Sequence, residues 1–122
     1  MNILYDEHLD GAIAPHDKAD VLADLSRAIP DLTLLHHEED LRPFECDGLS
    51  VYQVLPMLVA LPETLDQVET LLRRCHALGV PVVTRGAGTG LSGGALPLEQ
   101  GVLLVMSRFK RILEVDPEAR VA

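Results

Sequence analysis

An apolar run leads directly into a glycine-rich segment in Val80-Pro81-Val82-Val83-Thr84-Arg85-Gly86-Ala87-Gly88-Thr89-Gly90-Leu91-Ser92-Gly93-Gly94. The β-branched run Val80 to Thr84 predicts a strand. Five of the nine residues from Gly86 to Gly94 are glycine, and a loop of this composition loses much chain entropy on folding. Such a loop usually marks a place where the backbone needs a positive φ or where another group comes within side-chain distance. The segment therefore predicts a binding loop at the end of a strand.

The elements on either side of this segment predict a parallel sheet. Apolar strands are expected at Met57 to Leu61 and at Val102 to Met106. Thr64 and Gln67 have the spacing of a capping box, and the helix that they begin should end at Gly79. Its apolar face is expected to consist of Leu65, Val68, Leu71, Leu72, Cys75 and Leu78. A helix between two strands indicates a right-handed crossover that joins a parallel pair.

The remaining segments predict shorter elements. A helix is expected from Asp17 to Pro30, because Val21, Leu22, Leu25 and Ile29 recur at helical spacing. Short strands are expected at Leu32 to Leu35 and at Ile112 to Val115, and residues 38–52 should be irregular with one short helical turn. The sequence shows no internal repeat and no linker. We expect one domain of the α+β class, with a small, mostly parallel or mixed sheet and packed helices.

The glycine-rich loop offers the parts of a phosphate site, namely consecutive N–H groups, the hydroxyls of Thr89 and Ser92, and the guanidinium of Arg85. A P-loop is excluded because no lysine follows the glycines. The loop matches GxGxxG, but no helix fits between Gly93 and Val102 to hold a pyrophosphate, so Glu114 at the ribose-binding distance is a coincidence. A kinase glycine loop is also excluded, because it would need a lysine on the following strand, and Val102 to Met106 has none. A strand–loop–strand phosphate site remains, and the alternative is a flexible connection.

Composition limits the partners of the chain. Ten basic and nineteen acidic residues give a formal net charge of −9, which argues against nucleic acid and anionic membranes as partners. An anionic cofactor would then be bound by local N–H groups and one or two placed cations. No stretch approaches the ~20 apolar residues of a membrane span, and Met1 to Ala14 shows no signal-peptide pattern. We expect a cytoplasmic protein.

Other polar residues are interpreted as structural. Cys46 and Cys75 lack the spacing of a disulfide framework or a zinc site. On a strand, His36 and His37 would point to opposite faces, and no third ligand has suitable spacing, so no metal site is expected. Asp47 either caps a turn or touches a ligand, and the structural interpretation is favoured. Arg85 could pair with a carboxylate as well as with a diphosphate.

The stretch Pro81 to Pro97 resembles the pyrophosphate loop of the FAD-linked oxidases of the vanillyl-alcohol oxidase, or PCMH, type. Nearly the whole chain resembles the start of the FAD-linked subunit of bacterial glycolate oxidases. Outside the loop, the resemblance rests on Phe44-Glu45-Cys46-Asp47-Gly48-Leu49-Ser50, on the helix entry Pro62 to Gln67, and on Val102-Leu103-Leu104-Val105-Met106-Ser107-Arg108-Phe109. It implies an N-terminal extension over residues 1–55 and an FAD-binding subdomain over residues 56–122.

The resemblance implies a flavin held between two α+β subdomains. The residues that would contact the FAD diphosphate are Arg85, Gly86, Ala87, Gly88, Thr89, Gly90, Leu91, Ser92 and Gly93. Some members attach the flavin through a histidine where this chain has Thr89, so a non-covalent FAD is implied here. The family's domain continues beyond the position of Ala122, through the residues that bind substrate and take its proton. No catalytic residue is therefore assigned.

The implied reaction of the parent protein is the oxidation of a small 2-hydroxy acid such as glycolate to its 2-oxo acid, glyoxylate, with a hydride passed to the flavin. Other glycolate oxidase subunits are implied partners, through which the protein could associate with a membrane. The chain alone is expected to be inactive, to hold FAD weakly and to self-associate through exposed apolar surface. The alternative hypothesis is a non-catalytic structural or subunit-contact module that does not bind flavin on its own.

Overall fold

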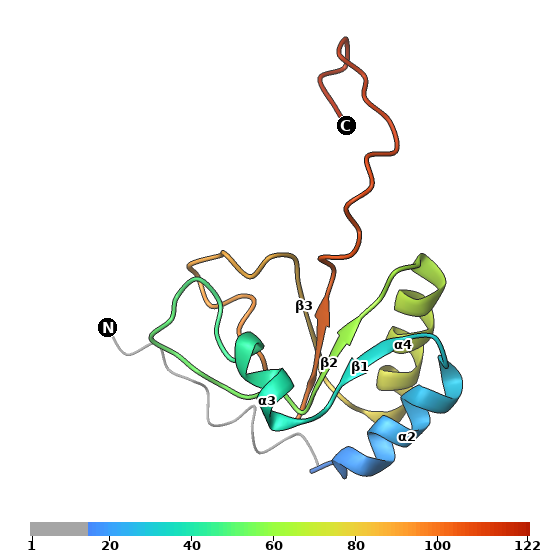
Figure 1. Ribbon diagram of the computed structural model, residues 1–122, viewed down its shortest axis with the longest axis vertical. Helices are drawn as coiled ribbons and strands as arrows, with labels where there is room; N and C mark the ends of the chain where they lie inside the picture. The colour runs from blue at the N-terminus through green and yellow to red at the C-terminus, as the bar shows by residue number, and fades with distance from the viewer. Residues whose placement is uncertain (1–14) are drawn as a thin grey trace.

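The computed structural model describes residues 15–122, and the segment 1–14, where the sequence shows no signal-peptide pattern, lies outside the described residues. The elements in chain order are α2 (Lys18–Ala28), β1 (Thr33–Leu35), α3 (Glu38–Leu41), the 3₁₀ helix η1 (Arg42–Phe44), β2 (Leu58–Leu61), α4 (Leu65–Leu78), β3 (Val82–Arg85) and β4 (Val102–Val105). Figure 1 shows the helices placed around a single sheet. The predicted α+β class is confirmed.

Strand β4 lies in the middle of the sheet, whose strand order is β1-β2-β4-β3. It pairs in parallel with β2 and with β3, while β1 pairs with β2 in antiparallel orientation. The predicted mostly parallel sheet is confirmed. The predicted crossover helix α4 joins β2 to β3, which run in the same direction with β4 between them. All four residues of β4 are buried, as in a strand covered on both faces, and this favours the central position.

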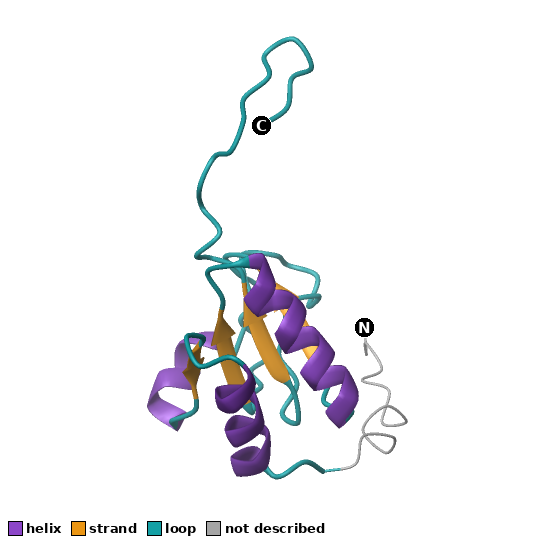
Figure 2. Ribbon diagram, turned by 90° about the vertical axis from the view of Figure 1, so that its right-hand side faces the viewer, coloured by secondary structure: helices purple, strands orange, loops and turns teal. Residues whose placement is uncertain are grey.

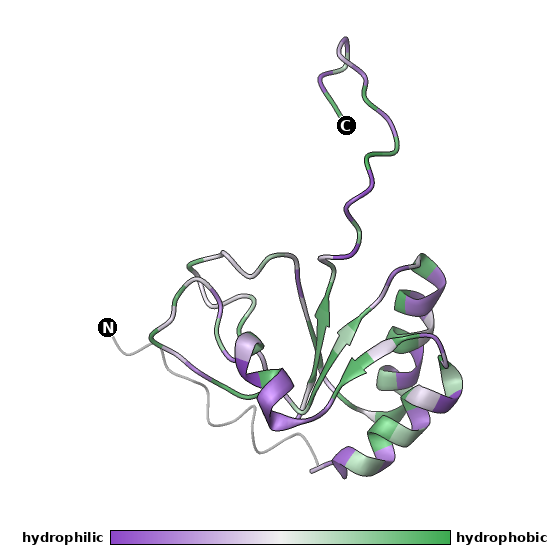
Figure 3. Cartoon of the chain, viewed as in Figure 1, coloured by the Kyte–Doolittle hydropathy of each residue, from purple (hydrophilic) through white to green (hydrophobic). Residues whose placement is uncertain are grey.

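Both faces of the sheet are covered by other parts of the chain. Successive side chains of β2 and β4 point to opposite faces. On one face, Leu58, Ala60, Val102 and Leu104 pack against Val21 and Leu25 of α2 and against Leu71 and Cys75 of α4. On the other face, Val59, Leu103 and Val105 pack against Leu41 of α3 and against Phe44. Figure 2 shows α2 and α4 on the same side of the sheet, and Figure 3 shows the apolar strands between the layers.

Helix α4 begins and ends where the sequence predicts. The N–H of Gln67 donates to Oγ1 of Thr64 at 3.3 Å. The Gln67 side chain accepts at 2.7 Å from the N–H of Glu63, one residue before the position that the capping box predicts. Gly79 ends the helix with a φ of +71°, in the left-handed region that favours glycine.

The apolar face of α4 is narrower than predicted. Leu71 and Cys75 are buried, and Val68 and Leu78 pack against the same core. Leu65 and Leu72 are 71% and 43% exposed, because they lie about a quarter turn or more from Leu71 around the helix. None of the helices in residues 15–122 combines the length and the apolar character needed to cross a membrane.

Helix α2 is joined to α4 by an ion pair. Asp17 caps α2, since its carboxylate accepts from the N–H of Ala19 at 2.7 Å. About two turns further along the helix, Asp24 accepts two hydrogen bonds from Arg74 of α4, one of them from Nε at 2.9 Å. The Asp24 side chain is 15% exposed. The hydrogen bonds and the positive charge of Arg74 lower the pKa of Asp24 below its ordinary value.

The predicted strand at Ile112 to Val115 is wrong. Residues 107–122 leave the sheet as an extended segment (Figure 1), in which one isolated bridge joins Asp116 to Val121. The side chains of Ile112, Leu113 and Val115 are 74%, 80% and 63% exposed. A β-branched run becomes a strand only where a neighbouring strand takes its backbone hydrogen bonds, and none of the described strands lies beside this one.

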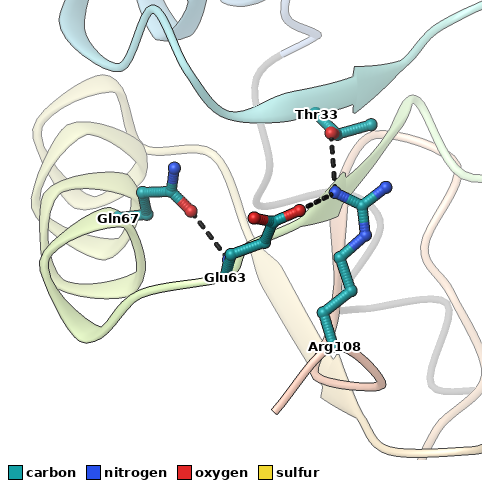
Figure 4. A network of polar contacts seen from close by, with 4 residues as sticks. All are labelled: Thr33, Glu63, Gln67 and Arg108. Carbon is teal, nitrogen blue, oxygen red and sulfur yellow. Dashed lines mark hydrogen bonds and ion pairs between the residues drawn. The ribbon is translucent and has the colours of Figure 1, made fainter.

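A polar network at one edge of the sheet holds the start of this extended segment (Figure 4). Arg108 Nη1 donates to Oγ1 of Thr33 at 2.9 Å and to a carboxylate oxygen of Glu63 at 2.6 Å. Thr33 begins β1, Glu63 follows β2, and Arg108 follows β4. The network therefore joins three strands at the edge where the parallel strands end.

The ion pair between α2 and α4 predicts a dependence of stability on pH. We expect Asp24→Asn to lower the melting temperature at pH 7, because Arg74 loses its charged partner. A carboxyl group whose pKa is lowered by folding stabilises the protein above its ordinary pKa of 3.8, and that contribution is lost as the pH falls through the lowered value. The difference between the two proteins, followed by circular dichroism melts from pH 7 to pH 3, should therefore shrink at acid pH.

The matched control is Glu69→Gln, which removes the exposed pair with Arg73 on the outer face of α4. Exposed pairs at this spacing contribute roughly 0.3–0.5 kcal/mol. A loss of stability as large in Glu69→Gln as in Asp24→Asn would contradict the role assigned to the pair between the helices.

Candidate functional site

The glycine-rich loop connects two parallel strands without a helix. It leaves β3 after Arg85 and returns to β4 at Val102, and none of residues 86–101, all of which the structure describes, is helical. The loop is itself the crossover that a parallel connection requires. This confirms the strand–loop–strand arrangement. The loop starts at the edge where β2, β3 and β4 end, which is where open α/β sheets place their ligands.

The glycines of the loop fall into two classes. Gly88 and Gly93 have φ values of +71° and +75°, so the path of the backbone requires glycine there. A Cβ atom on Gly86, Gly90 or Gly94 would meet no atom within 4 Å, and the φ values of these three residues lie outside the left-handed region. The fold of the chain gives no reason for glycine at these three positions.

The open side of the loop faces solvent. The exposed residues of the segment 86–93 are Gly86, Ala87, Thr89, Gly90, Leu91 and Ser92, while Gly88 and Gly93 are half-buried. Leu91 reaches 70% exposure. The glycines with free space above them leave the backbone on this side open to an approaching group. Backbone N–H groups along such a loop form the kind of concavity that binds anions.

Arg85 lies beneath the loop rather than on its open side. It is the last residue of β3 and shares a face with Val83, which packs against the core that contains Val105. Arg85 is 7% exposed. Its Nη1 donates to the carbonyl of Cys46 at 2.6 Å, and its Nη2 donates to the carbonyl of Phe44. The guanidinium therefore joins β3 to a segment about forty positions earlier in the chain.

The same segment touches the tip of the loop. A Cβ atom on Gly48 would lie 2.6 Å from the carbonyl oxygen of Thr89 and 2.8 Å from that of Gly90, so only glycine allows this approach. A cavity of about 340 Å³ lies between the two segments, lined by Phe44, Cys46 and Asp47 on one side and by residues 85–88 on the other. We call residues 44–48 the wall of the loop.

Asp47 is the second buried charged residue here, with 6% of its surface exposed. Its Oδ1 accepts from the N–H of Leu49 at 2.8 Å, which is the turn-capping role that the sequence favours. Among the described residues, Asp47 Oδ2 and Arg85 Nε are buried without a hydrogen-bond partner. Burial lowers the pKa of Arg85, and the neighbouring Cys46 and Asp47 side chains act in the opposite direction.

The structure brings most of the predicted site residues together. Residues 86–93 form one continuous open loop, as expected. Arg85, predicted to contact a diphosphate, has both terminal nitrogens bound to backbone carbonyls. The contact between the wall and the loop is not among the predicted features, although residues 44–50 belong to the family resemblance and Asp47-Gly48 is a turn pair.

Two of the residues interpreted as structural differ in detail from expectation. His36 and His37 follow the end of β1, so they do not alternate across the sheet, and their ring centroids are 4.0 Å apart.

The two cysteines lie in different surroundings. Cys75 is fully buried in the core, and burial raises the pKa of its thiol to about 11. Cys46 is half-buried at the cavity.

The comparisons with known proteins agree with this geometry. The profile of the FAD binding domain family matches residues 56–122, which include the loop and both strands that it joins. The chain belongs to the FAD binding domain family. FAD is therefore its cofactor.

Similar proteins are named for the oxidation of 2-hydroxy acids. The chain is 58% identical over all of its 122 residues to "Glycolate oxidase subunit GlcD" of Escherichia coli (strain K12), and spans 24% of that protein. It is 42% identical over 65 residues, 53% of the chain and 14% of the relative, to "D-lactate dehydrogenase" of Archaeoglobus fulgidus. The chain thus spans about a quarter or less of the length of these relatives.

Solved structures show the same fold. A substrate-bound structure of p-cresol methylhydroxylase superimposes with a TM-score of 0.71 at 20% identity, over 88% of this chain and 22% of that one. Alkyldihydroxyacetonephosphate synthase gives 0.68 at 23% identity, over 85% and 21%. The sequence-based assignment to the PCMH type of FAD-binding fold is confirmed.

Because Cys46 is half-buried and Cys75 is fully buried, we expect the two thiols to differ in reactivity in the native protein. The thiolate is the reactive form, and Cys75 is buried with a pKa of about 11. At pH 8 we expect iodoacetamide to modify Cys46 in the folded chain and Cys75 only after denaturation, as read by mass spectrometry of the peptides. Cys46→Ser should abolish labelling of the native protein. Equal rates of labelling at the two cysteines would show that the α4 core opens readily.

Proposed function

We propose that the backbone N–H groups of residues 86–93 hold the diphosphate of FAD. The observation that supports this is the set of glycines that the fold itself does not require. Gly86 and Gly90 have ordinary φ values and free space where a side chain would stand, so a bound group that approaches the backbone there explains their identity. The hydroxyls of Thr89 and Ser92 belong to exposed residues of the same segment and would add donors.

The charge of the chain makes a local site necessary. At a formal net charge of −9, the whole molecule repels a dianionic group, and only nearby dipoles and cations can offset that repulsion. Loop N–H groups provide such dipoles without adding a mobile side chain. The buried guanidinium of Arg85 places one positive charge beneath them. The arrangement therefore favours an anion at the loop.

For the complete protein we propose the oxidation of a small 2-hydroxy acid, with glycolate converted to glyoxylate. The support is the 58% identity to a glycolate oxidase subunit, together with relatives named for D-lactate and D-2-hydroxyglutarate oxidation. Bound FAD supplies the acceptor for the hydride of the α-carbon. We assign no described residue of this chain to the removal of the hydroxyl proton, and its residues would bind and orient the cofactor.

The partners and location follow from the same comparison. The E. coli relative is named as a subunit, so we propose that the complete protein works with other subunits of a glycolate oxidase. The cytoplasmic location and the self-association of the isolated chain stay predictions. Sedimentation of the 122-residue chain would test the second.

If the loop holds the diphosphate, adding one methyl group to its open side should weaken the binding of FAD. The test uses a chimera in which this chain replaces the matching segment of the E. coli relative, so that a full-length flavoprotein is measured. We expect Gly90→Ala to weaken FAD binding by at least about tenfold, equivalent to ~1.4 kcal/mol, because the methyl occupies the space of the diphosphate. The melting temperature without FAD should not change, since that space is open. Quenching of flavin fluorescence gives the affinity.

The matched control is Gly94→Ala, which adds the same methyl in equally open space just outside the proposed contacts. Its FAD affinity should stay near that of the unsubstituted chimera. Unchanged affinity in Gly90→Ala would overturn the assignment of the diphosphate to this loop. An unsubstituted chimera that folds but takes up no FAD would overturn the proposed function itself.

The residue at position 89 predicts that the flavin is released on denaturation. Threonine offers a hydroxyl but no ring nitrogen to bond to the isoalloxazine. After acid precipitation of the FAD-loaded chimera, we expect all flavin absorbance in the supernatant and none in the protein pellet. Flavin that remains with the peptide containing Thr89 would contradict a non-covalent cofactor.

A further inference from the structure

We propose that Arg85 is a positioning residue that fixes the glycine-rich loop to its wall, residues 44–48, and does not itself contact the diphosphate. The wall would then be part of the FAD site although it precedes the matched family domain, which begins at residue 56. This inference rests on the proposed binding of the FAD diphosphate at residues 86–93. It assigns to Arg85 a role different from the one that the sequence predicts.

The first step is the direction of the guanidinium. Its two terminal nitrogens donate to the carbonyls of Phe44 and Cys46, two acceptors on the same segment of the wall. A planar fork with fixed donor directions suits two carbonyls at once. Both terminal nitrogens are therefore engaged inside the protein.

The second step is the backbone that folds over the guanidinium. Gly88 has a φ of +71°, and a Cβ atom there would lie only 2.8 Å from Nη1 of Arg85. The first turn of the loop is thus shaped around the side chain. Because Arg85 is 7% exposed, the loop covers it from the solvent side and lies between the guanidinium and an approaching diphosphate.

The third step is a separate contact at the tip of the loop. The backbone of Gly48 approaches the carbonyls of Thr89 and Gly90 so closely that a Cβ atom would lie within 2.6 to 2.8 Å of them. The wall therefore supports the loop at two points, through Arg85 at its base and through Gly48 at its tip. The orientation of the N–H groups between these points depends on both contacts.

Burial of the charge is compatible with this role. Removing a guanidinium from water is costly unless carbonyls and an opposite charge surround it. Two carbonyls accept hydrogen bonds from Arg85, and the buried Asp47 lies near enough to favour its charge without forming an ion pair with it, while Nε stays without a partner. A binding loop held within a fraction of an ångström by such contacts keeps its donors in the productive arrangement, and a supporting shell that is loosened weakens the site.

The experiment compares three substitutions in the same chimera: Arg85→Lys, Arg85→Ala and Gly48→Ala. Lysine keeps the charge but cannot donate to two carbonyls with a rigid fork. We expect Arg85→Lys and Arg85→Ala to weaken FAD binding by similar factors, each at least about tenfold. Gly48→Ala should also weaken binding, although it alters no group that would touch FAD. Arg73→Lys, on the exposed face of α4, is the matched control and should bind FAD normally.

Circular dichroism and melting without FAD show whether each variant is folded. Near-normal affinity in Arg85→Lys with a loss in Arg85→Ala would overturn the proposal, because the charge alone would then act on the diphosphate. If the arginine variants do not fold, Gly48→Ala decides. Normal affinity in folded Gly48→Ala overturns the proposal whatever the arginine variants do. Absence of FAD from the unsubstituted chimera would instead sink the proposed function.

Discussion

The site depends on the pairing of β4 with two parallel neighbours. Because β2 and β3 both run parallel to β4, the carboxyl ends of all three strands meet at one edge. A chain that leaves β3 must then travel the length of the sheet before it can enter β4. In this protein that return is made by the glycine-rich loop and not by a helix. The long connection between β3 and β4, which we propose to bind the FAD diphosphate, is therefore also required by the topology of the sheet.

A long connection without secondary structure must satisfy or expose its own backbone polar groups. Here its base is closed against Arg85 and its tip against Gly48, while its other side is open to solvent. The glycines of the loop fall into two groups that correspond to its closed side and its open side. Gly88 and Gly93 allow the loop to turn, and Gly86 and Gly90 leave its outer face without side chains. A single run of small residues thus meets two different physical demands.

The sequence predicts the local elements well, because the determinants of α2, α4 and the apolar strands are contiguous. Asp17, Thr64 and Gly79 cap helices where expected. It does not predict the strand order, since whether β4 pairs with β2 depends on contacts between distant segments. The predicted strand at Ile112 to Val115 is wrong for a similar reason, because an apolar pattern alone does not provide a neighbouring strand. The wall could not be predicted, because the carbonyls of Phe44 and Cys46 leave no trace in the side-chain pattern.

For Arg85, residue type and structural surroundings favour different roles. An arginine beside a glycine-rich loop in an acidic protein is the obvious partner for a phosphate. Yet a guanidinium that reached the ligand directly would have to hold both itself and a flexible loop in place, at the expense of side-chain and backbone entropy. Buried beneath the loop, with Asp47 nearby, the same side chain orders the backbone before any ligand arrives.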